Sequence, residues 1–107
     1  MKRLILATLF TAALSFNLAA QETEDNSIGG ICKSYSELAG NIMAARQANM
    51  PIIKVYEIAD GNGIAIAMIK DAYAQPLFTT ENYKNDIIVT FSNDVFLSCI
   101  NKFDEEV

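Results

Sequence analysis

The sequence contains no histidine and only two cysteines among its 107 residues. Without histidine, a Ser-His-Asp triad, a histidine general base and a zinc site of the usual kind have no residues to form them. If the two cysteines pair with each other, no thiol remains as a nucleophile. A glycine-rich phosphate-binding loop is also missing, and nothing among the 13 acidic residues singles out a catalytic pair. These absences predict a protein that is not an enzyme and that holds no cofactor or metal.

Calcium is the one metal that the spacing of polar residues brings into question. Asp60, Asn62 and Asp71 stand at ligand-like spacing. An EF-hand, however, needs an oxygen ligand and its invariant glycine where this sequence has Ile64 and Ala65. We therefore interpret residues 60–63 as a turn in which Asn62 caps the helix that follows.

Basic residues are few and do not cluster. Lys and Arg number 8 against 13 Asp and Glu, which gives a net charge of −5. An acidic chain without a basic cluster is a poor nucleic-acid binder, so we expect no nucleic-acid partner.

The N-terminal residues have the features of a secretory signal peptide. Lys2 and Arg3 precede an uncharged, mostly apolar run over residues 4–16, and small side chains follow at Ala19 and Ala20. The alternative is a membrane anchor, but the run is shorter than the roughly 20 apolar residues that a spanning helix needs. We expect cleavage after residue 20, no stable membrane span afterwards, and a periplasmic or secreted product of a bacterial or phage gene.

The expected organisation is a signal peptide (1–20), a flexible acidic leader (21–30), a helical domain (31–103) and an acidic tail (104–107). The leader carries three acids and two glycines and little that could be buried. Cleavage would leave 6 basic against 13 acidic residues, a net charge of −7. Neither composition nor spacing indicates an oligomeric state.

Two cysteines in a short exported chain predict one disulfide, between Cys32 and Cys99. This bond would join the start of the folded region to its end. A CxxC redox pair is excluded by the spacing. In the chain-entropy model, closing so long a loop removes roughly 4 kcal/mol of freedom from the denatured state, so we expect a structural bond.

Alternation of β-branched residues with hairpin turns is missing, and apolar residues recur instead at spacings of three and four. We expect an all-α fold, a small four-helix domain closed by the disulfide, with the first and last helices as antiparallel neighbours. Asn49, Pro51, Asn62, Pro76 and either Thr79 or Thr80 mark where helices end and begin. The predicted helices cover residues 31–48, 51–59, 63–74 and 81–102.

Each predicted helix has an apolar face at 100° per residue. In the first helix this face collects Cys32, Tyr35, Ala39, Ile42 and Met43, whereas Lys33, Glu37, Gly40, Asn41 and Gln47 fall elsewhere. In the second it collects Ile52, Val55, Ile58 and Ala59. The third helix is apolar on most sides, and we expect it to be the most enclosed. In the last helix the face collects Tyr83, Ile87, Ile88, Phe91, Val95 and Cys99.

Arg46 interrupts the apolar face of the first helix. A guanidinium there must be paired and hydrogen-bonded, or must reach an edge through its long stem. Counting back from Cys99 along an antiparallel neighbour places position 85 opposite Arg46. We expect a buried ion pair of Arg46 with Asp71 or Asp86, or capping of carbonyls at a helix end. A structural strut is the preferred interpretation, and a binding role is the alternative.

Phe96, Ile100 and Phe103 lie to one side of the apolar face of the last helix. They would pack under the leader or a loop, or form an exposed interaction patch for a partner.

A set of residues spread over the mature chain carries a resemblance. The set comprises Cys32, Ala39, the "IMAARQ" segment at 42–47, Pro51, Ala72, Tyr73, Phe91 and Cys99. In these residues the chain resembles a group of small exported helical proteins of proteobacteria and their phages. The resemblance implies export, a helical fold and a bracketing disulfide, and it implies no activity.

Two functional classes follow from these patterns. The first is a non-catalytic binding, accessory or inhibitor-type protein that acts on a protein partner in the cell envelope, an analogy of type without a shared motif. The second is a periplasmic acid-stress chaperone resembling the HdeA type. In that family the cysteines do not bracket the whole domain and lysine-rich segments are expected, so this sequence departs from it. The binding protein is the preferred hypothesis.

Overall fold

The computed structural model describes the backbone of residues 27–106 and the side chains of residues 27–103. The predicted signal peptide and residues 21–26 of the predicted leader lie outside the described residues. The chain divides into two compact units, residues 1–31 and 32–107. The packing described below is that of the second unit.

Four helices form the described part of the chain: α2 (Ile28–Gln47), α3 (Ile52–Ala59), α4 (Gly63–Tyr73) and α5 (Glu81–Glu106). The all-α, four-helix prediction is therefore confirmed. The first helix begins three residues before the predicted start, so positions 28–30 of the expected leader are helical. The last helix extends to position 106, four residues beyond its predicted end.

Local capping explains where most helices begin and end. Asn49 and Asp60 adopt left-handed conformations, with φ of 64° and 51°, where α2 and α3 finish. Asn62 accepts a hydrogen bond from the Ala65 amide at 2.9 Å, and Thr80 accepts one from the Tyr83 amide at 3.3 Å. The predicted caps at Asn49, Asn62 and Thr80 are confirmed.

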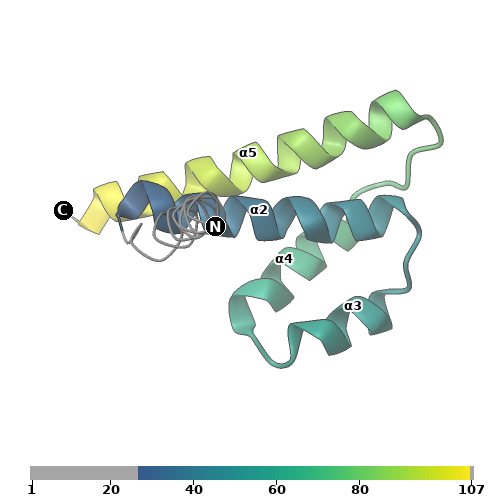
Figure 1. Ribbon diagram of the computed structural model, residues 1–107, viewed down its shortest axis with the longest axis horizontal. Coiled ribbons are helices and arrows are strands. Elements are labelled where there is room, and N and C mark those ends of the chain that lie inside the picture. The colour runs from purple at the N-terminus through teal and green to yellow at the C-terminus, as the bar shows by residue number, and fades with distance from the viewer. Residues whose placement is uncertain (1–26, 107) are drawn as a thin grey trace, which may run out of the picture. The chain divides into compact units, whose positions relative to one another are not determined.

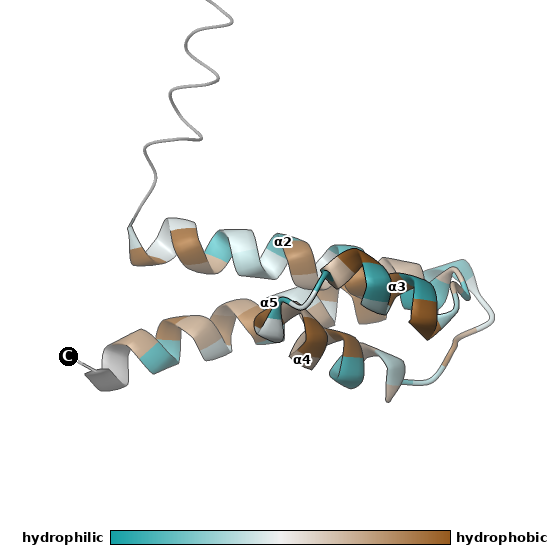
Figure 2. Ribbon diagram, turned by 90° about the horizontal axis from the view of Figure 1, so that it is seen from below, coloured by the Kyte–Doolittle hydropathy of each residue, from teal (hydrophilic) through white to brown (hydrophobic). Residues whose placement is uncertain are grey.

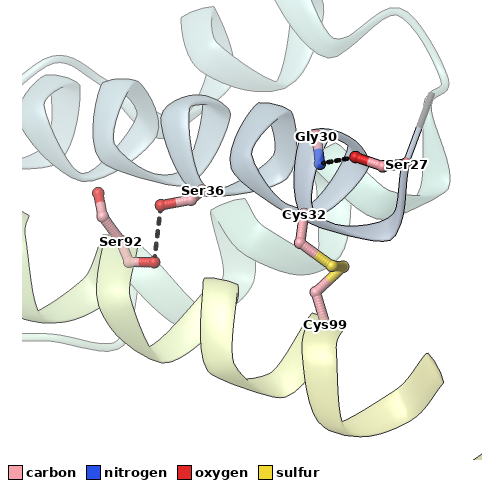
Figure 3. The surroundings of a disulfide bond; sticks show 6 residues. All are labelled: Ser27, Gly30, Cys32, Ser36, Ser92 and Cys99. Atoms are coloured by element: carbon pink, nitrogen blue, oxygen red, sulfur yellow. Dashed lines mark hydrogen bonds between the residues drawn. A yellow bond between two sulfur atoms is a disulfide. The ribbon is translucent and has the colours of Figure 1, made fainter. Parts of the chain in front are cut away.

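A disulfide joins α2 to α5, as predicted: Cys32 and Cys99 have an S–S distance of 2.05 Å (Figure 3). Close by, the Ser36 hydroxyl donates to the Ser92 carbonyl at 2.9 Å. At the far end the Lys84 ammonium donates to the Gln47 carbonyl at 2.6 Å. From Cys32 to Gln47, these three contacts make α2 an antiparallel neighbour of α5 (Figure 1).

The contact between α2 and α5 is close at Gly40. A Cβ built at Gly40 would lie 2.5 Å from Oγ of Ser92 and 3.9 Å from its Cβ. A larger residue at this position would therefore require the Ser92 hydroxyl to turn away. Gly40 faces a neighbouring helix, although the sequence pattern placed it away from the packed face.

All four helices contribute to one core. Its buried members are Ala39, Ile42, Met43, Val55, Met68, Ile69, Ala72 and Phe91. The helices α2 and α4 contribute three of these residues each, although α4 is the shorter, and Ile64 at the start of α4 remains 46% exposed. No helix in the described part of the chain is both long and apolar enough to cross a membrane.

Candidate functional site

The shortest helix leaves most of its apolar side chains in solvent. In α3 only Val55 is buried, whereas Ile53 is 67%, Tyr56 55% and Ile58 76% exposed. Ile52 is also exposed, at 44%. We call Ile52, Ile53, Tyr56 and Ile58 the α3 surface. Figure 2 shows hydrophobic residues of α3 interleaved with hydrophilic ones.

The structure corrects the predicted core face of α3. The sequence placed Ile52 and Ile58 on that face together with Val55, but both isoleucines are exposed. At 100° per residue this predicted stripe is about 120° wide. The core residues of the other helices cover only the middle of this stripe, at Val55 and partly at Ala59. Its two edges, Ile52 and Ile58, therefore stay in solvent.

A hollow of about 220 Å³ lies beside Ile58, between α2, α3 and α4. Leu38, Ile42 and Ile69 contribute apolar side chains to its lining. The exposed Ile58 side chain thus borders an apolar depression, which would receive an apolar group from a partner.

Arg46 is held by a backbone carbonyl. Its Nε and Nη2 atoms both donate to the Gln75 carbonyl, at 3.1 and 2.9 Å. Its guanidinium also lies over the Tyr73 ring, with Cζ 5.3 Å from the centroid. Gln75 follows Ala74, the C-cap of α4. The capping alternative therefore describes this contact.

The predicted ion pairs are not formed within the described part of the chain. Asp71 and Asp86 are both exposed, and neither contacts the Arg46 guanidinium. Along the helix axis Asp86 lies near the height of Arg46, as expected, because Lys84 of α5 contacts Gln47, the neighbour of Arg46. Arg46, one position earlier on α2, is rotated by 100° toward the end of α4 and away from α5. This geometry supports the strut interpretation of Arg46.

Gln47 is the one described polar side chain that is fully buried, with 3% exposure. Its Nε2 donates to the Pro76 carbonyl at 2.8 Å, and its Oε1 accepts from the Phe78 amide at 3.0 Å. The side chain thereby pins the linker between α4 and α5 to the end of α2. The sequence pattern placed Gln47 outside the packed face, which is wrong. The side chain is buried because its two hydrogen-bond partners, Pro76 and Phe78, belong to the linker that covers it.

We call Arg46, Gln47, Tyr73 and Lys84, with the main-chain carbonyls they bind, the α2-end network. Tyr73 donates its hydroxyl proton to the Met50 carbonyl at 2.6 Å. Burial raises the pKa of Tyr73 above its usual 10.0, and the nearby Arg46 charge partly offsets that rise. The two cations sit at the C-terminal end of α2, where they also complement the helix dipole.

The predicted interaction patch is half-buried. Phe96, Ile100 and Phe103 have intermediate exposure on α5, outside the main core cluster. Leu97, which the sequence pattern did not single out, is 58% exposed between them. The larger apolar exposure therefore lies on α3, and the role of the three predicted residues stays a prediction.

Among residues 27–103, no group of three His, Cys, Asp or Glu side chains could hold a metal ion. No buried side-chain nitrogen or oxygen in this part of the chain lacks a hydrogen-bond partner. The buried polar groups described here thus have their partners within the fold.

Comparison with known proteins adds no assignment. No protein-family model, no curated protein and no solved structure matches this chain.

Proposed function

We propose that this protein is a non-catalytic binding protein of the cell envelope, of the accessory or inhibitor type, which occupies a protein partner. The observation that carries the proposal is the α3 surface, where Ile53, Tyr56 and Ile58 are each more than half exposed. Single exposed apolar residues are ordinary on protein surfaces. At 100° per residue, Ile52, Tyr56 and Ile53 share one side of this eight-residue helix, which favours a surface that a partner covers. Ile58 is exposed on the other side of the buried Val55, next to the apolar hollow.

The fold presents this surface on a constrained scaffold. Val55 anchors α3 in the core, and the left-handed Asn49 and Asp60 fix the turns on either side. The disulfide restrains the two longest helices relative to each other. Little conformational entropy would then be lost when a partner binds this surface, which favours affinity. Tyrosine is also among the residues that commonly dominate binding energy at interfaces.

The envelope location rests on two features. The disulfide is of the kind that persists in oxidising compartments such as the periplasm or the medium. The N-terminal sequence has the pattern of a signal peptide, which would direct the chain there.

The contacts of the fold favour the binding protein over the acid-stress chaperone. No described carboxylate, from residue 27 to residue 103, accepts a side-chain or capping hydrogen bond or belongs to an ion pair. The contacts that hold the helices together therefore do not depend on a described carboxylate. We expect the near-ultraviolet circular dichroism at pH 3 to match that at pH 7, whereas an acid chaperone would lose it.

The experiment is affinity capture from envelope extract, using oxidised protein expressed from the full-length sequence with a C-terminal tag. The test variant is Ile53→Ser with Ile58→Ser, and the matched control is Val89→Ser with Leu97→Ser. The control pair is 57% and 58% exposed on α5, so both variants remove two exposed apolar side chains. Thermal unfolding should show that both remain folded.

We expect one enriched protein that untagged material competes away, retained by the control variant and lost from the test variant. Equal capture by both variants would contradict binding through α3. If the protein suppresses the aggregation of unrelated proteins, and does so only at acid pH, the chaperone hypothesis would be supported and the binding-protein hypothesis rejected.

A further inference from the structure

A hollow of about 510 Å³ lies between α4 and α5, away from the α3 surface. We call it the α4/α5 groove. The lining side chains used below are Ile64, Met68 and Asp71 from α4 and Phe91, Asp94 and Val95 from α5. On each helix they follow spacings of three and four residues, so each wall is a single helical stripe.

The floor and the rim of the groove differ in chemistry. Met68 and Phe91 are almost buried, at 7% and 9% exposure, and offer an apolar floor. Asp71 and Asp94 are exposed and place one carboxylate on each wall. No lysine or arginine lines the groove, so both charged side chains there are negative.

We propose that the α4/α5 groove binds an amphipathic helix of a protein partner whose apolar stripe is flanked on both sides by lysine or arginine. Two facing helical stripes leave room for a third helix that packs its apolar side chains on the floor. The α4 wall runs from Ile64 to Gln75, about 16 Å at the usual helical rise, which matches an occupant of about three turns.

Charge selects this occupant over other amphipathic helices. A helix seated on Met68 and Phe91 brings the residues beside its apolar stripe to the two rims, next to Asp71 and Asp94. Positive side chains there are attracted from both walls, and negative ones are repelled from both. This site is separate from the α3 surface and stands even if α3 binds nothing.

The probes are two synthetic helical peptides with the same leucine stripe, one flanked by lysine and the other by glutamate. Fluorescence anisotropy would measure their binding to the oxidised protein at low and physiological salt. We expect the lysine peptide to bind about tenfold more tightly or better, and the difference to shrink as salt screens the rim charges.

Three variants locate the binding. Asp71→Lys with Asp94→Lys should weaken the lysine peptide about tenfold and strengthen the glutamate peptide. Glu57→Lys with Asp86→Lys makes the same change in net charge at exposed positions outside the groove, and should change each affinity by less than about threefold. Ala67→Trp, at an exposed position on the α4 wall, should fill the groove and abolish binding of both peptides.

Equal effects of the two charge-reversal variants would show that net charge alone attracts the lysine peptide, and would overturn the proposal. Unchanged binding to the folded Ala67→Trp variant would overturn it as well. Neither result would bear on the proposed binding through the α3 surface, because that proposal is tested separately by Ile53→Ser with Ile58→Ser.

Discussion

The guanidinium of Arg46 holds the main-chain carbonyl of Gln75 with two hydrogen bonds, from Nε at 3.1 Å and from Nη2 at 2.9 Å. Gln75 begins the linker that leads from α4 to α5, and the next side chain on α2, Gln47, binds the same linker at Pro76 and Phe78. The end of α2 therefore fixes where α4 stops and where α5 starts. This role is structural and requires no partner.

Replacement of Arg46 by methionine should lower the free energy of unfolding by about 1–2 kcal/mol. The change removes two charge-assisted hydrogen bonds and the contact with the Tyr73 ring, while methionine restores part of the apolar packing. Denaturant unfolding measures the loss, and Arg46→Lys should fall between the two proteins because lysine lacks the planar fork. An unchanged or higher melting temperature together with a lost partner would contradict the strut interpretation.

Replacement of Gln47 by leucine should be more costly, about 2–4 kcal/mol. Leucine is similar in volume, but it leaves the Pro76 carbonyl and the Phe78 amide without their partner in a buried place. The matched control is Asn41→Leu, an exposed amide on the same helix, which should change the stability by less than about 0.5 kcal/mol. Similar losses in both variants would show that the Gln47 bonds contribute nothing.

Stability should fall at alkaline pH through Tyr73. Burial raises the pKa of Tyr73 above 10.0, and the neutral hydroxyl donates to the Met50 carbonyl. A folded-state pKa above the unfolded value means that the contribution is complete below pH 10 and is lost as the pH rises through the raised pKa. The free energy of unfolding measured from pH 8 to pH 12 should fall less steeply in Tyr73→Phe. Tyr83→Phe, which alters an exposed ring, should follow the unchanged protein.

Removal of the disulfide by Cys32→Ser with Cys99→Ser should lower the free energy of unfolding by about 4 kcal/mol. The cysteines are 67 positions apart, so reduction restores much freedom to the unfolded chain. Equilibrium unfolding with and without reductant measures the same quantity in the unmodified protein. A difference below about 1 kcal/mol would mean that the packed core and the hydrogen bonds between α2 and α5 hold the two helices together without the disulfide.

The parts of the fold that depend on local chemistry were predictable from the sequence. Asn62 caps a helix through its own side chain, and Asn49 ends one by a backbone conformation that asparagine tolerates. The pairing of the cysteines then set the antiparallel register of α2 and α5, which Lys84 and Gln47 confirm at the far end.

The parts that depend on a distant partner were not predictable. Helical spacing places Gln47 outside the packed face. Its side-chain amide nevertheless makes two hydrogen bonds to a linker about thirty positions away in the sequence. Helical spacing placed Gly40 away from the packed face, but it lies against Ser92 of α5. Ile58 has the right spacing for the core and stays in solvent, because no neighbouring helix reaches the edge of its stripe. The sequence pattern therefore could not locate the α3 surface.

The most direct test of the central claim places a photoreactive phenylalanine at position 53 or, as the control, at position 89 of the full chain in living cells. Both side chains are exposed, at 67% and 57%, but only position 53 belongs to the α3 surface. We predict one discrete cross-linked product from position 53 that is absent from position 89. The same products from both positions, or none from position 53, would contradict a binding function for α3.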